Sequence, residues 1–178
     1  MGSRIHLDAY YTPEPLARAL VDLLPIVPRS RVVEPSVGGG AFARALRAGG
    51  AHVEGVDVSC LASGLADCDD SHIGDWLTWR GRVDWVVGNP PYKHAEAHIR
   101  HALEVAPRVA MLLRLAMLES QKRAPFWEAH PPRKVWVLSE RPSFTGGGTD
   151  SAAYGWFWWD RAWSFPPELG WVSWRGGR

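Results

Sequence analysis

The sequence predicts an α/β fold built on a doubly wound, mostly parallel sheet of seven strands. Apolar, strand-like runs alternate with helical stretches along the chain, which is typical of a parallel sheet covered on both faces. Polar residues gather where the expected strands end, and glycines follow the first strand. The length of 178 residues, with 46% hydrophobic and 22% charged residues, fits one globular domain.

Each element is predicted from local signals. A first helix is expected over 13–24, because Thr12 suits an N-cap, Pro13 suits the first turn and Pro25 stops it. A strand over 31–35, a glycine turn and a helix over 41–48 then form a βα unit. A strand is expected over 52–58, and a separate short strand is expected to end near Ile73. Further strands are expected over 83–88, 108–113, 134–138 and 153–159, with helices over 95–106 and 119–128.

Composition excludes several classes of protein. No run of 18 apolar residues occurs, and the N-terminus lacks the basic-then-apolar pattern of a signal peptide, so we expect a cytoplasmic protein with no membrane association. Cys60 and Cys68 form no CxxC pair, so neither a disulfide framework nor a zinc site is indicated. The sequence leaves both a monomer and a homodimer open.

The charge distribution leaves two interpretations open. The net charge of +1 is too small to announce a nucleic-acid-binding protein. Between Arg100 and Arg141, eight basic residues face four acidic ones, which fits either a local basic face or a solvated, mixed surface. Of the eleven tryptophans, we expect most in the core, with base stacking as a role for one or two.

The glycine segment after the first strand predicts a ligand loop. Small residues stand there between a strand and a helix, where a backbone must approach a ligand closely. Asp57 ends the next strand, 17 residues past Gly40, the offset at which a carboxylate reaches a ribose; a solvated turn aspartate is the alternative. No phosphate-binding motif is matched cleanly, which favours a cofactor with a ribose but no phosphate.

The tetrapeptide Asn89-Pro90-Pro91-Tyr92 follows a buried strand, and its two prolines predict a rigid, extended turn. The Asn89 amide oxygen and the Pro90 carbonyl are suited to accept both hydrogens of a planar NH₂ group and to aim its lone pair. Tyr92 offers a flat face for an extruded base. A structural turn with a packed tyrosine is the alternative.

These segments resemble a known family. Asn89 to Tyr92 is similar to the catalytic signature of nitrogen-directed S-adenosylmethionine methyltransferases, Glu34 to Phe42 resembles their cofactor loop, and Tyr10-Tyr11-Thr12-Pro13 resembles the segment that covers the methionine end of the cofactor. The resemblance implies a Rossmann-like class I methyltransferase fold. It implies that S-adenosylmethionine binds to Tyr11, Thr12, Pro13, Glu34, Pro35, Ser36, Gly38, Gly40, Phe42, Asp57, Val58, Asp75, Trp76 and Asn89, with its adenine near Asp75 and Trp76.

The later segments 111–115, 122–127 and 141–145 look like those of small phage or prophage DNA adenine methylases. This resemblance implies base flipping and methyl transfer to adenine N6 in DNA, with Tyr92 and Phe144 beside the flipped base. Nothing after Trp163 is long enough for a separate target-recognition domain, so we expect 1–178 to be a single catalytic domain. A protein glutamine amide or an RNA base nitrogen is the alternative acceptor, and a non-catalytic nucleic-acid-binding module is the alternative class.

A histidine series and a glycine run are further features of the sequence. His94, His98 and His101 fall at i, i+4 and i+7, so they share one helix face, but methyl transfer needs no metal and we expect a solvated or DNA-facing stripe. The run Thr145 to Thr149 contains three glycines, and we expect either a lid or a plain hairpin connection there.

Overall fold

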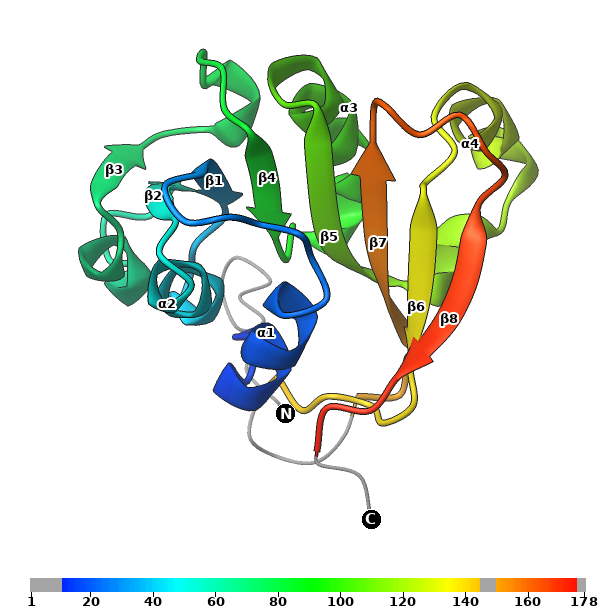
Figure 1. The fold of residues 1–178 in the computed structure, drawn as a ribbon, viewed down its shortest axis with the longest axis horizontal. Coiled ribbons are helices and arrows are strands. Elements are labelled where there is room, and N and C mark those ends of the chain that lie inside the picture. Colours follow the sequence, from blue (N-terminus) through cyan, green and yellow to red (C-terminus); the bar gives the residue numbers. More distant parts are fainter. Residues whose placement is uncertain (1–10, 145–149, 176–178) are drawn as a thin grey trace, which may run out of the picture.

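The computed structural model describes residues 11–144 and 150–175 as one mixed sheet with helices on both faces (Figure 1). Tyr10 and the predicted loop 145–149 lie outside the described residues. The strands are β1 (Arg31–Pro35), β2 (His52–Asp57), β3 (Asp70–Ile73), β4 (Trp85–Gly88), β5 (Arg108–Arg114), β6 (Lys134–Leu138), β7 (Tyr154–Asp160) and β8 (Glu168–Val172).

The strand order is β3-β2-β1-β4-β5-β7-β6-β8, and every neighbouring pair is parallel except the two pairs that contain β7. The chain therefore runs outward from β1 in one direction to β2 and β3, and in the other from β4 onward. Such a reversal is the switch point at which open α/β sheets bind ligands. The doubly wound, mostly parallel fold class is confirmed.

The sheet has eight strands among the described residues, one more than predicted, because β8 was missed. Three of its five side chains are exposed and none is buried, so the strand lacks the apolar alternation that identifies a half-buried strand. Its glycine, Gly170, also weakens the strand signal. Parallel pairing with the neighbouring strand β6 stabilises β8, and no local sequence signal reports that pairing.

The helices match the prediction except at two ends. Helix α1 (Glu14–Val21) stops three residues early, and α4 (Ala124–Ala129) begins five residues late, after the 3₁₀ turn η5 (Gln121–Arg123). Pro125 occupies the first turn of α4, where its missing N–H has no intrahelical partner to lose. Helices α2 (Ala41–Ala48) and α3 (Ala95–Val105) agree within one residue.

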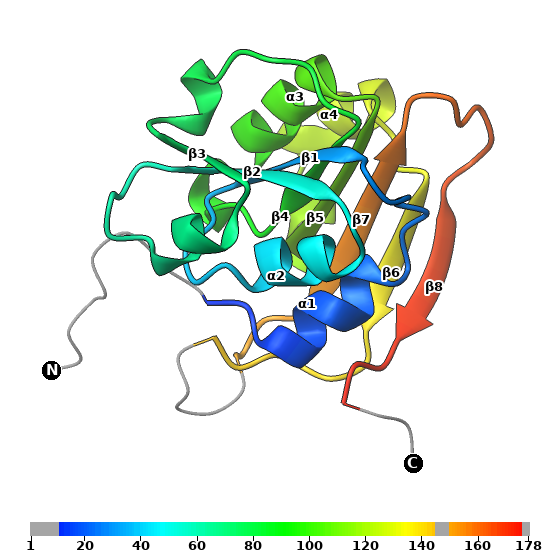
Figure 2. The ribbon, with the colours of Figure 1, turned by 60° about the vertical axis from the view of Figure 1, so that its left-hand side comes forward.

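Two apolar cores flank the sheet (Figures 1 and 2). Helices α1 and α2 pack on one face, where Phe42 stacks on Trp156 with ring centroids 5.4 Å apart. Helices α3 and α4 cover the other face. The expectation that most tryptophans serve the core is confirmed, because the buried ones are Trp76, Trp79, Trp85, Trp136, Trp156, Trp158 and Trp159. In the described part of the chain, no helix has the length and apolar character needed to cross a membrane.

Candidate functional site

The glycine loop between β1 and α2 has a left-handed backbone. Ser36, Gly38 and Gly40 have φ angles of 63°, 53° and 76°. A Cβ on Gly40 would lie 2.6 Å from the Cα atom of Gly64, and one on Gly39 would lie 2.9 Å from the Tyr11 ring. The loop therefore needs glycine both for its conformation and for the close approach of neighbouring segments.

Asp57 ends β2 and holds this loop in place. Its Oδ2 atom accepts a hydrogen bond from the Gly38 N–H at 3.0 Å, and its Oδ1 atom accepts one from the Ser59 N–H at 2.9 Å. The next side chain, Val58, is 61% exposed. The predicted carboxylate thus lies beside the glycine turn, with an exposed apolar side chain next to it.

Glu34 lies at the carboxyl end of β1 with only 2% of its surface exposed. Its Oε2 atom has no hydrogen-bond partner among the described residues. Burial raises the pKa of this carboxyl group well above its usual value, although the Ala43 backbone and the Arg44 charge lower it. A buried carboxyl oxygen without a partner suits a cationic or hydrogen-bonding ligand group.

The tetrapeptide, the glycine loop and the N-terminal segment meet at the end of β4. The Asn89 Nδ2 atom donates a hydrogen bond to Thr12 Oγ1 at 3.2 Å, and Pro13 follows as the N-cap of α1. A cavity of about 30 Å³ lies between the three segments. It is lined by Tyr11, Thr12, Glu34, Ser36, Val37, Gly38, Gly39, Gly40, Ala41, Phe42 and Asn89, of which only Val37, Gly39 and Ala41 were not predicted.

Tyr92 is half-buried in an aromatic cluster at the start of the 3₁₀ turn η3 (Tyr92–His94). Its ring centroid lies 5.5 Å from that of Tyr154 and 6.5 Å from that of Phe144. Burial raises the pKa of its hydroxyl group. Phe144 lies near Tyr92 and is only 6% exposed, so its ring packs in the cluster and presents little surface to solvent.

Three residues that sequence reasoning missed complete this cluster. The Arg114 guanidinium lies over the Tyr92 ring, 4.8 Å from its centroid, and its Nε atom donates to the Tyr154 hydroxyl at 3.2 Å. That hydroxyl donates to Asp150 Oδ2 at 2.7 Å. Burial raises the pKa of Tyr154 to about 12. Only the antiparallel register of β5 and β7, which pairs Arg114 with Tyr154, brings these residues together.

The structure does not bring Trp76 to the crevice. Its side chain is 2% exposed, stacks on Trp79 and donates from Nε1 to the His98 carbonyl at 3.3 Å, so its ring belongs to the core. Asp75 is exposed, and its carboxylate accepts the Leu77 N–H at 2.9 Å at the start of the 3₁₀ turn η2 (Trp76–Thr78).

The expected solvated or DNA-facing histidine stripe is wrong. His94 is exposed, but His98 and His101 are buried, and His101 bonds to the Trp79 carbonyl at 3.0 Å. His98 and His101 pack against Trp76 and Trp79 of the segment before β4, which the spacing of three polar residues did not reveal. Within 11–144 and 150–175, no group of three or more His, Cys, Asp or Glu residues is placed to hold a metal ion.

The basic residues between Arg100 and Arg141 are partly neutralised. Arg100 pairs with Glu96 at 2.9 Å, and Lys134 pairs with Glu168 at 3.0 Å. Arg133 pairs with Asp160 at 3.1 Å. These ion pairs favour the mixed-surface interpretation over a continuous basic face.

The comparisons with known proteins place the fold. No family model and no curated protein sequence matches the chain. A candidate class I S-adenosylmethionine-dependent methyltransferase from Listeria monocytogenes superposes with a TM-score of 0.73 at 15% identity, over 96% of this chain and 68% of that one. A candidate RNA methyltransferase from Pyrococcus horikoshii gives 0.69 at 20% identity, over 89% and 91%.

A type I restriction-modification methyltransferase subunit from Streptococcus thermophilus gives a TM-score of 0.73 at 15% identity, over 93% of this chain and 47% of that one. The present chain therefore spans about half the length of this subunit. These likenesses have low sequence identity and high coverage of the present chain. They show that the chain has the fold of class I S-adenosylmethionine-dependent methyltransferases.

Proposed function

We propose that the protein is an S-adenosylmethionine-dependent methyltransferase that methylates the exocyclic N6 of adenine in DNA. The hydrogen bond from Asn89 to Thr12 carries this proposal. It joins the segment that would hold the acceptor nitrogen to the segment that would cover the methyl donor, next to the glycine loop. Methyl transfer requires that donor and acceptor sites meet in this way.

The residues around the loop fit the cofactor. The unpartnered Glu34 oxygen suits the ammonium group of the methionine part, and the Asp57 carboxylate, beside exposed Val58, suits the ribose. The Tyr11 ring lies against Gly38 and Gly39 and is 54% exposed, so we expect it to move when the cofactor enters the narrow cavity. When bound, S-adenosylmethionine supplies a methyl group activated by an adjacent positive sulfur.

The tetrapeptide would position the acceptor. The Asn89 amide oxygen and the Pro90 carbonyl would accept the two N6 hydrogens, which aims the nitrogen lone pair in line with the methyl group. Tyr92 would stack on a base flipped out of the duplex, an interaction worth about 1–3 kcal/mol. The surrounding apolar residues favour a reaction in which positive charge is dispersed.

RNA is the second candidate acceptor. The Pyrococcus horikoshii protein, a candidate RNA methyltransferase, is covered over 91% of its length, so it carries little beyond the fold seen here. The type I restriction-modification subunit supports the assignment to DNA instead. A protein glutamine amide presents the same planar NH₂ group and is the third substrate to test.

The deciding experiment supplies methyl-labelled S-adenosylmethionine with unmethylated DNA, total RNA or protein extract in separate reactions. Each polymer is then digested, and the labelled unit is identified by mass spectrometry. N6-methyladenine in DNA supports the proposal, whereas label only in RNA or protein moves the activity to that acceptor. Absence of both label and cofactor binding by calorimetry would favour a non-catalytic module.

The variant Asn89→Ala is the control for mechanism. It should lower the methylation rate by about 10²-fold or more, the size of effect seen when a group that stabilises a transition state is removed. Cofactor affinity should change little, because the proposed ammonium and ribose contacts come from Glu34 and Asp57. Full activity of Asn89→Ala would contradict the mechanism.

A further inference from the structure

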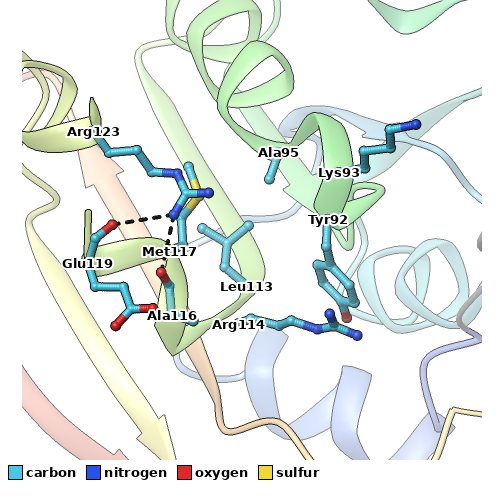
Figure 3. A pocket seen from close by; sticks show the side chains of 9 residues that line it. All are labelled: Tyr92, Lys93, Ala95, Leu113, Arg114, Ala116, Met117, Glu119 and Arg123. Atoms are coloured by element: carbon cyan, nitrogen blue, oxygen red, sulfur yellow. Dashed lines mark hydrogen bonds between the residues drawn. The ribbon is translucent and has the colours of Figure 1, made fainter. Parts of the chain in front are cut away.

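A second cavity, of about 400 Å³, lies beside Tyr92 (Figure 3). It is bounded by the carboxyl end of β5 and by the short helices η4 (Leu115–Leu118) and η5, and its volume is in the range of small-molecule sites. Leu113, Met117 and Ala95 give it apolar walls. Because Tyr92 belongs to both places, the cavity adjoins the proposed acceptor site.

Arg114 lies on one side of this cavity, and its guanidinium already contacts the aromatic cluster around Tyr92. Its guanidinium lies over the Tyr92 ring, bonds to the Tyr154 hydroxyl and has the Asp150 carboxylate 3.8 Å away. Burial opposes ionisation of Asp150, but the Ala152 N–H, the Tyr154 hydroxyl and Arg114 together hold its pKa below the usual value. The positive charge of Arg114 is therefore largely offset before any ligand arrives.

Arg123, on the other side, is held by neutral groups. Its Nη1 atom donates to the carbonyl oxygens of Ala116 and Glu119, at 3.2 and 3.3 Å. No carboxylate lies within ion-pair distance of it in the part of the chain that the structure describes. These two bonds engage one of the three guanidinium nitrogens, and a guanidinium carries five N–H donors. The two bonds hold the Arg123 guanidinium in position, and because both acceptors are neutral, its positive charge is not offset.

The other charged side chains that line the cavity neither neutralise the Arg123 charge nor add a second positive charge beside it. The Glu119 carboxylate points away from the Arg123 head, which contacts the Glu119 backbone instead (Figure 3). The Lys93 side chain extends away from both arginines (Figure 3). Arg123 is therefore the positive group that this cavity presents to a ligand.

We propose that this cavity binds a phosphodiester group of the DNA strand that carries the target base, with Arg123 donating to the phosphate oxygens. The planar guanidinium matches the geometry of two phosphate oxygens, and the apolar walls suit the adjoining sugar. Because the overall charge is only +1, such fixed local contacts must supply much of the attraction for the strand. The proposal rests on the proposed function, since it assigns a second contact to the same acceptor.

Arg123 also stabilises the short helix η4. One of its carbonyl partners belongs to Ala116 within η4, and the other belongs to Glu119, the C-cap residue of η4. The test must separate this structural role from phosphate binding. Arg123→Gln removes the charge but keeps a side-chain N–H donor. Arg80→Gln is a matched control, because Arg80 is exposed and its Nη1 atom also donates to two backbone carbonyls, of Leu77 and Trp79, but lies outside the cavity.

The measurement is binding of a labelled DNA duplex to the full chain by fluorescence anisotropy, in the presence of S-adenosylhomocysteine, from about 0.05 to 0.2 M salt. The slope of log Kd against log salt reports the number of phosphate contacts. For Arg123→Gln the slope should fall by about 0.9, so that a tenfold dilution of salt strengthens binding about eightfold less in the variant than in the parent. Arg80→Gln should keep the slope of the parent, and urea unfolding checks that both variants fold.

The outcomes separate this inference from the proposed function. If the folded Arg123→Gln variant keeps the parent slope and affinity, or if Arg80→Gln lowers the slope equally, the phosphate site is wrong although DNA remains the acceptor. If the parent does not bind DNA, the assignment of DNA as acceptor is wrong. If RNA is bound instead, with a slope that falls for Arg123→Gln alone, the phosphate contact stands and the acceptor class is overturned.

Discussion

Glu34 illustrates at the residue scale how burying a carboxyl group in the candidate site lowers stability. Its carboxyl group is buried, and burial is the main cause of its raised pKa. Above the ordinary pKa of a glutamate, an unfolded chain has lost this proton while the folded chain keeps it. The unfolded state then binds fewer protons, so the free energy of unfolding should fall as pH rises toward the folded-state pKa.

We expect Glu34→Gln to remove this part of the pH dependence. Urea unfolding across the range from acidic to mildly alkaline pH should show the parent losing stability relative to the variant as pH rises. Glu104→Gln is the control, because the Glu104 side chain is 76% exposed, and it should follow the parent curve. Parallel curves for the parent and Glu34→Gln would show that this carboxyl group titrates normally.

Asp57 belongs to the residue scale as well, since its carboxylate accepts the Gly38 N–H of the glycine loop and the N–H of Ser59 just after β2. Asp57→Ala leaves both donors without this acceptor, and a hydrogen bond to a charged group is worth about 1.5–3 kcal/mol. Cofactor affinity measured by calorimetry should fall about tenfold or more. Asp22→Ala, at an exposed position after α1, should bind as the parent does. Equal affinity of the Asp57 variant would remove this residue from the cofactor site.

At the scale of elements, α3 shows how a helix face can be misread. Periodicity predicts that His94, His98 and His101 lie on one side, but His94 ends the turn η3 before α3 and is exposed, whereas His98 and His101 within α3 are buried. The η2 segment, through Trp76 and Trp79, packs against the last two, and burial lowers the pKa of His98 from about 6.5 to about 4. An unfolded chain binds the proton at the higher pH, so the folded state should lose stability as pH falls from about 6.5 to about 4.

Across that window, we expect the His98 side chain to account for up to about 3 kcal/mol of lost stability, at about 1.4 kcal/mol for each pKa unit. His98→Gln, which does not titrate, should flatten the acid limb of a plot of unfolding free energy against pH. His94→Gln removes the exposed histidine that immediately precedes α3 and should leave the limb unchanged. An acid limb that survives in His98→Gln would assign it to other groups.

At the scale of the whole molecule, β7 joins the two halves of the sheet. It pairs antiparallel with β5 and β6, and its tryptophans reach both cores. Trp156 has no exposed surface and stacks on Phe42 of α2, whereas Trp171 of β8 is 66% exposed. Strand β7 therefore links helix α2, which follows the glycine loop, to the strands beyond β7 in the sheet.

Trp156→Ala should lower the free energy of unfolding by about 3–5 kcal/mol, because it opens a cavity in a packed core. Trp171→Ala makes the same chemical change at an exposed edge, and surface substitutions are typically within about 0.5 kcal/mol. Urea midpoints, with the slope of the transition compared between variants, measure both. Similar losses for the two variants would mean that β8 contributes as much packing as the centre of the sheet.

The sequence by itself determined the fold class, the glycine loop, Asp57 and the tetrapeptide. Each depends on chemistry within a few residues: the alternation of apolar runs, the left-handed turn that favours glycine, and the stiffness of two prolines. Strand ends that share one edge put Asn89 near the glycine loop, whereas Thr12 was expected there only from the family resemblance; the structure places the Asn89 Nδ2 and Thr12 Oγ1 atoms 3.2 Å apart.

Only the tertiary structure decided the rest. Pairing between β5 and β7 brought Arg114 to Tyr154 across 40 residues, and pairing with β6 made an exposed segment into β8. The burial of Trp76 followed from packing of η2 against α3. These features depend on register and on which face is covered, and both are fixed by contacts between distant segments that no local pattern of residues reports.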